Sequence, residues 1–274
     1  PWNGDTSTLN VLLLRTWRDG RWWPDEKQIS ETAVVETLPR RMASADDYTG
    51  MRETMLLHDG VELPCVIETA WEIAERIEPG AGSDGRFVFR QGDPAVVAEL
   101  ALVLPAGAQP RFAGTNGAPA PDRKTGENGE TILRWTETGL APTGAHPPAD
   151  ADRWAPAVSW STWPGWPALG DAVAGTVDAA AADLGPALAD TVAALVRSAP
   201  TSPARARRLA AFIDETVRPV RSDASFWQYV PRPASRTWET AYGHALDRLV
   251  LAAGLMRAAG FEAHPLLAGA LSLI

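Results

Sequence analysis

The sequence TWETAYGHALDRLVLAAGLMRAAGFEAHPLL, residues 237–267, decides the fold. A helix is expected over about residues 245–259, because apolar side chains recur on nearly every side of it, which is typical of a central, buried helix. Gly260 suits the C-terminal end of this helix, and residues 261–267 are expected to leave it as a strand. Tyr242 and Gly243 therefore stand immediately before the first turn of a buried helix.

More helices are expected upstream of this segment. Residues 169–182 are rich in alanine, and Pro186 suits the first position of a second helix. A third helix begins at Ser202 and Pro203, an N-cap residue followed by a first-turn proline. Residues 169–274 are thus predicted to be the mainly helical part of the chain.

The first 140 residues are predicted to be β-structure. A strand at residues 10–17 precedes Asp19-Gly20, the dipeptide that tight hairpins favour because both central positions need a positive φ. Residues 67–74 alternate apolar and polar side chains, which predicts a strand with one buried face.

Two further strands complete this region. An alternating run follows Pro94, and Asn128-Gly129 precedes a short strand at residues 131–136. Short strands separated by Gly and Pro turns favour an antiparallel β-sandwich over residues 1–140, and hence an α+β chain. The residues expected to share one face of the run after Pro94 are Val96, Ala98, Leu100, Leu102 and Leu104.

Residues 141–168 are rich in Pro and Trp and show neither a helical nor a strand period. We expect an extended linker over the surface, because Pro fixes φ and removes a hydrogen-bond donor. Four tryptophans would hold this linker to the domains by burying aromatic surface: Trp154, Trp160, Trp163 and Trp166.

Composition excludes several classes of protein. The net charge of −9 and pI near 5.0 argue against a nucleic-acid partner. Cys65 is the single cysteine, so no internal disulfide or multi-cysteine metal site is expected. No apolar run approaches the roughly 18 residues of a membrane-spanning helix. No metal or cofactor is expected, because a GxGxxG match precedes a strand-like segment and the histidines are scattered. These residues are Gly80, Gly82 and Gly85, and His58, His146, His244 and His264.

The segment around Tyr242 resembles a bacterial family in which a domain of unknown function 3857 precedes a transglutaminase-like, papain-like core. That core has a motif close to Tyr-Gly-Asp-Cys-Lys-Asp-Lys, a Leu/Ala-rich helix and an ending of the type Arg-Ala-x-Gly-ϕ-x-Ala. In this chain the motif is matched by Tyr242, Gly243 and Asp247, and Arg248 stands in place of a Lys. The ending is matched by residues 257–263. The strands of the family's N-terminal domain are similar to residues 46–48, 51–54 and 66–68 of this chain. The junction between that domain and the core is similar to residues 159–169.

The resemblance implies a nucleophilic Cys at position 245, where the positive end of a helix favours a thiolate. This chain has Ala245, which carries no nucleophile, and His244 and Leu246 also differ from the motif. The family's catalytic His and Asp lie on strands beyond the helix, so residues 169–274 correspond to a core truncated at its C-terminus. His244 is a candidate base with Asp247 one turn away. Alternatively, Asp247 caps the helix or pairs with Arg248 or Arg236.

Three functions follow as hypotheses. The leading one is a non-catalytic module that binds a protein or peptide and has no intact catalytic site. The second is a fragment of an active cysteine transglutaminase or protease-like enzyme, with a Cys at position 245 in nature. The third is a carbohydrate-binding module, which the 12 Trp residues suggest. The resemblance alone implies a periplasmic or extracellular protein.

Overall fold

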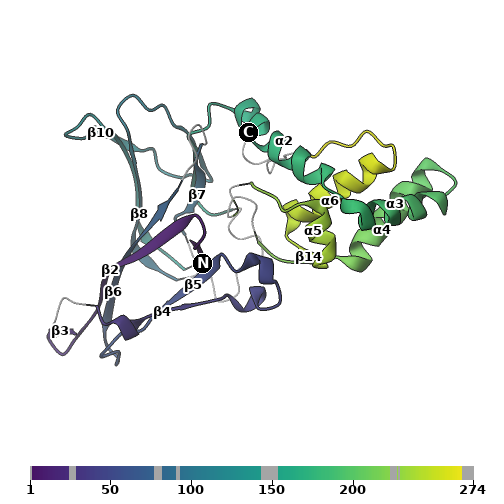
Figure 1. Ribbon diagram of the computed structural model, residues 1–274. Coiled ribbons are helices and arrows are strands. Elements are labelled where there is room, and N and C mark those ends of the chain that lie inside the picture. The colour runs from purple at the N-terminus through teal and green to yellow at the C-terminus, as the bar shows by residue number, and fades with distance from the viewer. Residues whose placement is uncertain are drawn as a thin grey trace. The chain divides into compact units, whose positions relative to one another are not determined.

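The computed structural model describes residues 2–24, 29–76, 82–90, 93–142, 154–222, 227 and 229–266. The chain is α+β, with the sheets in its first part and the helices in its last (Figure 1). Contacts divide it into two compact units. The first unit joins Pro1–Arg76 to Val173–Leu266, and the second contains Ile77–Ala172. This division differs from the expected boundaries at 140 and 168, because residues 44–48 of the N-terminal segment form hydrogen bonds with residues 218–247 near the other end of the sequence.

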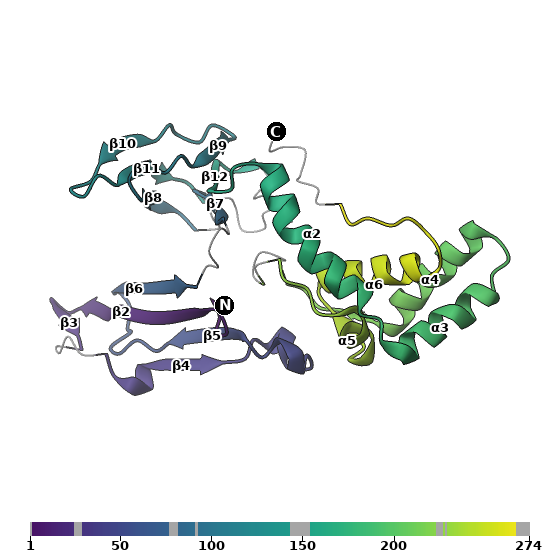
Figure 2. The same cartoon turned by 45° about the horizontal axis from the view of Figure 1, so that its top comes forward.

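The first unit contains two antiparallel three-stranded sheets. Their strand orders are β3-β2-β6 and β1-β5-β4. Figure 2 shows β2 and β6 side by side in the first of these sheets. The strands are β1 Trp2–Asn3, β2 Ser7–Arg18, β3 Arg21–Trp23, β4 Val34–Thr37, β5 Met51–Leu56 and β6 Val66–Glu75. Three 3-10 turns accompany them: η1 Glu31–Ala33, η2 Arg40–Met42 and η3 Asp46–Tyr48.

The predicted hairpin after β2 is confirmed. Arg18 faces Arg21, and the two residues between them, Asp19 and Gly20, have φ values of 53° and 76°. Both values are positive, as a tight hairpin requires. This local turn fixes the register of β3 on β2.

The predicted buried face of β6 is wrong, although the strand itself is confirmed. Ile67, Trp71 and Ile73 are 50%, 57% and 40% exposed. Burial is uneven across this sheet, because Leu14 and Thr16 of β2 are buried although they pair with Thr69 and Ile67 of β6. Alternation shows which side chains share a face, whereas burial depends on what packs against that face.

The second unit contains two further antiparallel sheets, with orders β10-β11-β8 and β7-β12-β9. Asn128-Gly129 lies in the turn before β11, and Gly129 has a φ of 84°. The core around Phe89, Leu133 and Trp135 is apolar. The strands are β7 Asp84–Val88, β8 Ala95–Leu104, β9 Arg111–Thr115, β10 Asp122–Thr125, β11 Thr131–Leu140 and β12 Ala157–Ser161.

The predicted face of β8 holds for four of its five residues. Ala98, Leu100, Leu102 and Leu104 pack on this core, but Val96 is 85% exposed. The ladder with β11 is interrupted opposite Val96, and Gly139 has a positive φ of 64° there. This local change of backbone direction allows Ala95 to pack on the core instead.

The expected linker at residues 141–168 contains β12, the central strand of its sheet, so the prediction of a segment without regular structure is wrong there. The backbone of β12 pairs with β7 along one edge and with β9 along the other. Trp163 is buried, with 9% exposure, as expected of a side chain that packs this segment against the protein, but Trp154 and Trp166 are 71% and 58% exposed.

The helices follow the predicted order and pack together at the end of the chain (Figure 1). Thr201, rather than Ser202, caps α4, since its hydroxyl accepts a hydrogen bond from the Ala204 N–H. Pro186 lies in the first turn of α3, as predicted. The helices are α2 Trp166–Ala182, α3 Gly185–Arg197, α4 Ser202–Thr216, α5 Ala234–Glu239 and α6 Ala245–Ala258. Two short strands, β13 Arg218–Pro219 and β14 Tyr242–Gly243, pair in parallel.

The helix expected to be central, α6, is largely buried, although Leu249 is 41% exposed. Gly254 allows close packing, because a Cβ there would lie 2.4 Å from the Ala181 carbonyl oxygen. The predicted strand after Gly260 is wrong: residues 261–266 have no regular structure. The Phe261 N–H donates back to the Met256 carbonyl over 3.0 Å, which is a helix-ending motif rather than a strand ladder.

No single helix among the described residues has the length and apolar character needed to cross a membrane. The helices α2 and α3 meet these two criteria only as a pair, and they are bent by 79° at the break between them.

Candidate functional site

The start of α6 is the position where the resemblance places a nucleophile. β14 leads into it, and Gly243 is packed closely enough that a Cβ would lie 3.0 Å from Thr237 Cγ2. His244 is the N-cap, and Ala245, the first helical residue, is exposed. The side chain at the N-terminal end of this helix is therefore an exposed methyl group.

His244 is buried, at 1% exposure, and both of its ring nitrogens have partners. Nδ1 accepts a hydrogen bond from the Leu246 N–H over 3.2 Å, and Nε2 lies 3.3 Å from Asp247 Oδ1. The ring stacks on Trp227, with a centroid distance of 5.8 Å and an interplanar angle of 3°. Burial lowers the pKa of His244, an effect that the neighbouring Asp247 charge partly opposes. The imidazole is therefore neutral at pH 7, with its proton on Nε2 directed at Asp247.

Asp247 is fully buried and is satisfied by residues far away in the sequence. The Arg232 backbone N–H donates to Oδ1 over 2.8 Å, and Arg232 Nε donates to Oδ2 over 2.8 Å. The Tyr48 hydroxyl donates to the same Oδ2, while it accepts a hydrogen bond from the His244 N–H over 2.8 Å. Burial and the Asp247 charge raise the pKa of Tyr48, so it remains a donor.

The expected pairing of Asp247 with Arg248 or Arg236 is wrong. Arg248 binds Asp214 over 2.5 Å, on the outside of the helix. Arg236 binds Asp47, with Nη2 2.6 Å from Oδ1 and Nε 2.8 Å from Oδ2. An i,i+1 neighbour points to a different side of a helix, so Arg248 does not face Asp247.

Arg232 links the two carboxylates of this cluster. Its Nη1 donates to Asp47 Oδ2 over 2.6 Å, and its Nη2 donates to the Tyr242 carbonyl over 2.5 Å. The guanidinium also lies over the rings of Tyr48 and Tyr242, at 4.6 Å and 4.9 Å. Hydrogen bonds from Arg236, together with those from Arg232, hold the pKa of Asp47 below its usual range.

We call Asp47, Tyr48, Arg232, Tyr242, His244 and Asp247 the clasp. It joins η3, from the N-terminal segment of the first unit, to β14 and α6 from the C-terminal segment. The negative charges of Asp47 and Asp247 are balanced by Arg232 and by Arg236, which binds Asp47 from outside the clasp. A buried apolar cluster that includes Met42 and Met51 adjoins the clasp. Within the clasp, hydrogen-bond and ion-pair partners engage both carboxylate oxygens of Asp247 and both ring nitrogens of His244.

The sequence pointed to Tyr242, Gly243, His244, Ala245 and Asp247, and the structure brings all five together at the start of α6. The hydrogen-bond partners of these residues were not predicted from the sequence. Residues 46–48 form the turn η3 and not a strand as expected, whereas 51–54 and 66–68 do lie in strands. One signal for Arg232 was available: prolines on both sides of it, which restrict the backbone that presents its N–H to Asp247.

The remaining candidate residues lie elsewhere. His58 Nε2 is 3.2 Å from the Thr69 hydroxyl, and His264 is exposed and 3.5 Å from Glu262. Cys65 is a half-buried free thiol. Gly82 and Gly85 make room for the rings of Trp163 and Trp160, which accounts for two of the three glycines in the GxGxxG match. His146 and Gly80 lie outside the described residues.

Within the part of the chain that the structure describes, no three His, Cys, Asp or Glu side chains are grouped closely enough to hold a metal ion.

Comparisons with known proteins agree with the fold. No curated protein matches the chain. A crystal structure of a "putative protease" from Parabacteroides distasonis ATCC 8503 is similar, with a TM-score of 0.79 and 20% sequence identity. The similarity covers 94% of this chain but only 50% of that protein, so the chain spans about half the length of its structural neighbour. A family model described as a "Domain of Unknown Function with solved-structure structure (DUF3857)" matches residues 1–143. This match extends over more than half of the sequence, and the chain belongs to the DUF3857 family.

Proposed function

We propose that this chain is a non-catalytic module that binds a protein or peptide, built from a DUF3857 β-sandwich and part of a transglutaminase-like core. The observation that carries the proposal is Ala245, exposed at the start of α6 where such a core needs its thiol. A methyl group cannot attack a carbonyl carbon, so covalent acyl transfer at this position is excluded.

The neighbouring residues do not offer a substitute chemistry. Nδ1 of His244 is occupied by the Leu246 N–H, and Nε2 faces Asp247. The oxygens of Asp247 are taken by Arg232 and Tyr48. A general base must reach the proton that it removes, and these groups are directed into the protein. The similarity in fold to a protein described as a "putative protease" supports descent from an enzyme core.

The first experiment tests the thiol position. Ala245→Cys, in a Cys65→Ser background, is expected to react with iodoacetamide through a thiol whose pKa is below about 8.5, because the helix N-terminus stabilises the thiolate. Leu249→Cys is the matched control, since it lies in the middle of the same helix and is exposed. Equal alkylation profiles for the two cysteines would remove the papain-like assignment.

The second experiment tests binding. A phage-displayed peptide library is panned on the full chain, and selected peptides are measured against Ala245→Trp and the control Leu249→Trp. We expect Ala245→Trp to abolish binding because the indole covers the start of α6, and Leu249→Trp to retain it. Hydrolysis of casein, or transfer of an amine to a glutamine peptide, by the unaltered chain would contradict the non-catalytic proposal.

A fragment of an active enzyme is the second candidate, and the greater length of the structural neighbour favours it. The natural gene decides between the two. A Cys codon at position 245, followed by downstream strands that carry His and Asp, would favour the enzyme.

The tryptophan-based hypothesis of carbohydrate binding receives little support from the rings on β3. Arg15 lies 3.8 Å over Trp22, and Arg21 lies 3.6 Å over Trp23. Ring faces that stack on the protein's own guanidinium groups are not open platforms for a sugar. Trp163 is buried and is likewise closed to a sugar.

A further inference from the structure

The hairpin formed by α3 and α4 carries a run of positive charge in an acidic chain. Residues 191–213 contain four arginines and no Asp or Glu, whereas the net charge of the whole chain is −9. Figure 2 shows the two helices side by side, joined by the loop at residues 198–201. One arginine lies in the last turn of α3 and three lie in the first two turns of α4, so all of them are at the loop end of the hairpin. We call these four residues the arginine cluster: Arg197, Arg205, Arg207 and Arg208.

The arginine cluster lacks carboxylate partners. Within the part of the chain that the structure describes, no Asp or Glu forms an ion pair with any member of the cluster. Asp214 of α4 is bound by Arg248 of α6 over 2.5 Å. Glu215 comes seven positions after Arg208 in the sequence, which places it roughly 10 Å farther along the helix axis. The negative charge of α4 is therefore at the opposite end of this helix from the cluster.

The positions of the guanidinium groups fit a surface that faces a partner. Arg207 and Arg208 are exposed. Arg205 Nε donates to the Ala199 carbonyl over 3.1 Å, which holds its guanidinium against the loop. Arg205 and Arg208 are three positions apart and therefore neighbours on the helix surface, where like charges repel each other. A ligand with negative charge would remove this repulsion.

The surroundings of the cluster indicate which anionic partner fits. Within residues 167–222, all of which the structure describes, no large apolar side chain is exposed. A helix that lies on a membrane needs exposed apolar side chains to enter the lipid, and single-stranded nucleic acid needs exposed aromatic rings for stacking. Carboxylates need neither, because the planar guanidinium of Arg pairs with a carboxylate through two parallel hydrogen bonds. An acidic protein segment is therefore the partner whose chemistry matches the cluster.

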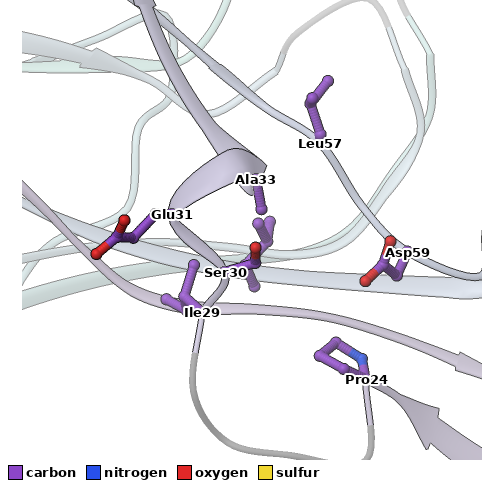
Figure 3. Close-up of a pocket in the computed structure, with 8 residues that line it drawn as sticks. Pro24, Ile29, Ser30, Glu31, Ala33, Leu57 and Asp59 are labelled. Atoms are coloured by element: carbon purple, nitrogen blue, oxygen red, sulfur yellow. The ribbon is translucent and has the colours of Figure 1, made fainter.

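The pocket beside β2 has the opposite charge. Its volume is about 310 Å³, and the ionisable residues of its lining are Glu31 and Asp59 (Figure 3). Both are carboxylates, which repel an anionic ligand. An acidic segment is therefore expected to select the arginine cluster over this pocket.

We propose that the arginine cluster is a docking surface for an acidic segment of a partner protein. The exposed guanidinium groups of Arg207 and Arg208 pair with Asp or Glu side chains of that segment, and the other two arginines add positive charge beside them. This surface is at the end of α4 that is remote from Asp214, the residue bound by Arg248 in the first turn of α6. It is thus separate from the peptide site proposed above, and its test is independent of that proposal.

The experiment measures the fluorescence anisotropy of a rhodamine-labelled peptide, Glu-Glu-Gly-Glu-Glu-amide, during titration with the full chain. The control peptide has Gln in place of each Glu. We expect saturable binding of the acidic peptide with a Kd of about 0.1 mM at low ionic strength, because each partly exposed ion pair contributes only modestly. An increase in ionic strength from about 0.01 M to about 0.15 M shortens the Debye length from roughly 30 Å to roughly 8 Å and should weaken binding about fivefold. Equal binding of the two peptides, or binding that does not respond to salt, overturns the proposal.

A matched pair of double variants locates the docking surface. Arg207→Gln/Arg208→Gln removes two exposed positive charges from α4 and is expected to weaken binding of the acidic peptide about tenfold. Arg123→Gln/Lys124→Gln removes two adjacent exposed positive charges from β10 and is the control, because it changes the net charge by the same amount. Equal weakening by the two double variants would mean that net charge alone attracts the peptide, and the docking surface would be excluded.

Ala245→Trp separates this proposal from the one at the start of α6. This variant is expected to bind the acidic peptide as tightly as the unaltered chain does, even though it loses the peptides selected by panning. Loss of acidic-peptide binding in Ala245→Trp, together with unchanged binding in Arg207→Gln/Arg208→Gln, would assign the acidic peptide to α6 and contradict the docking surface.

Further measurements compare other occupants of the surface. Phosphatidylcholine vesicles that contain phosphatidylglycerol, and an oligodeoxythymidylate of the same charge as the peptide, are each titrated against the full chain. Tighter binding of the acidic peptide than of either supports a protein partner, whereas tighter binding of the vesicles or the oligonucleotide overturns it. Sedimentation equilibrium tests for a second copy of the chain. A salt-sensitive dimer that Arg207→Gln/Arg208→Gln abolishes would assign the surface to self-association and overturn the proposed partner.

Discussion

The clasp and the β3-β2-β6 sheet both bury polar groups in the first unit, but the two regions satisfy them differently. In the clasp, the side chains of Asp247 and His244 have partners for both carboxylate oxygens and both ring nitrogens. In this sheet and in the loop that follows β5, buried atoms of Thr16, Trp23 and His58 have no hydrogen-bond partner among the described residues. A satisfied network stabilises one arrangement of the chain, whereas unsatisfied buried atoms cost stability. The comparison assigns fastening to the clasp and identifies the sheet as the region where a substitution can raise stability.

Removal of a charge from the clasp has the largest expected effect. Asp247→Ala leaves the Arg232 guanidinium, which is 14% exposed, with Asp47 as its remaining carboxylate partner, and leaves the Tyr48 hydroxyl without its carboxylate acceptor. We expect a loss of about 3–5 kcal/mol in the free energy of unfolding, measured by urea denaturation. The double variant Asp247→Leu/Arg232→Met sharpens the comparison, because removal of both charges should recover much of this loss. A double variant no more stable than Asp247→Ala would argue against charge as the cause.

The pH dependence of stability tests His244. Its pKa is lowered in the folded protein, so the unfolded chain binds the additional proton and stability falls as pH decreases below the unfolded pKa of about 6.5. The loss is complete once pH lies below the folded pKa. The slope approaches at most about 1.4 kcal/mol per pH unit for one proton.

His244→Asn keeps an N-cap acceptor, an amide oxygen in place of Nδ1, and removes this titration. Unfolding free energies measured between pH 7 and 5 should therefore depend less on pH in His244→Asn than in the unaltered chain. His264→Asn changes an exposed imidazole and is the control. A pH dependence unchanged by His244→Asn would exclude this residue as its origin.

The opposite sign is expected in the β3-β2-β6 sheet. Thr16→Val replaces an unpartnered buried hydroxyl by a methyl group of similar volume, so the protein should gain about 1 kcal/mol in unfolding free energy. Thermal unfolding measures the gain. A destabilised Thr16→Val would mean that the hydroxyl already has a partner, which would contradict the contrast with the clasp.

The smallest effect is expected at the rim of the clasp. Arg236 is 52% exposed although it holds Asp47 with two hydrogen bonds. Ion pairs in contact with water contribute little, so Arg236→Gln should change the urea midpoint less than any variant above. Because Arg236 also holds the pKa of Asp47 low, the stability that it contributes is present above about pH 4, the unfolded pKa of an aspartate, and the difference between Arg236→Gln and the unaltered chain should disappear as pH falls below that value. An effect as large as that of Asp247→Ala would contradict the distinction between rim and interior.

The sequence predicted those parts of the fold that depend on neighbouring residues. The Asp19-Gly20 hairpin, Pro186 at the start of α3 and the buried α6 all follow from local chemistry. The cap of α4 was misplaced by one residue, because Thr201 and Ser202 carry equivalent hydroxyls. The exposed face of β6 was missed, since alternation carries no information about what covers a sheet.

The candidate site was predicted only in part, for the same reason. Residues 242–247 are contiguous and were found together. Their partners lie far away along the chain: Tyr48 is 199 positions from Asp247, and Asp47 is 185 positions from Arg232. A single sequence gives no signal for such pairs, and the acidic and aromatic residues at 46–48 matched a strand pattern equally well.

The first unit is assembled from two segments between which residues 77–172 of the second unit are inserted. A ribosome releases the N-terminal segment first, so Asp47 and Tyr48 wait until Arg232 and Asp247 have been synthesised. The strands of the second unit lie within this inserted stretch, so its core is able to form in the meantime. The part of the molecule that begins first during translation is therefore the part that finishes last.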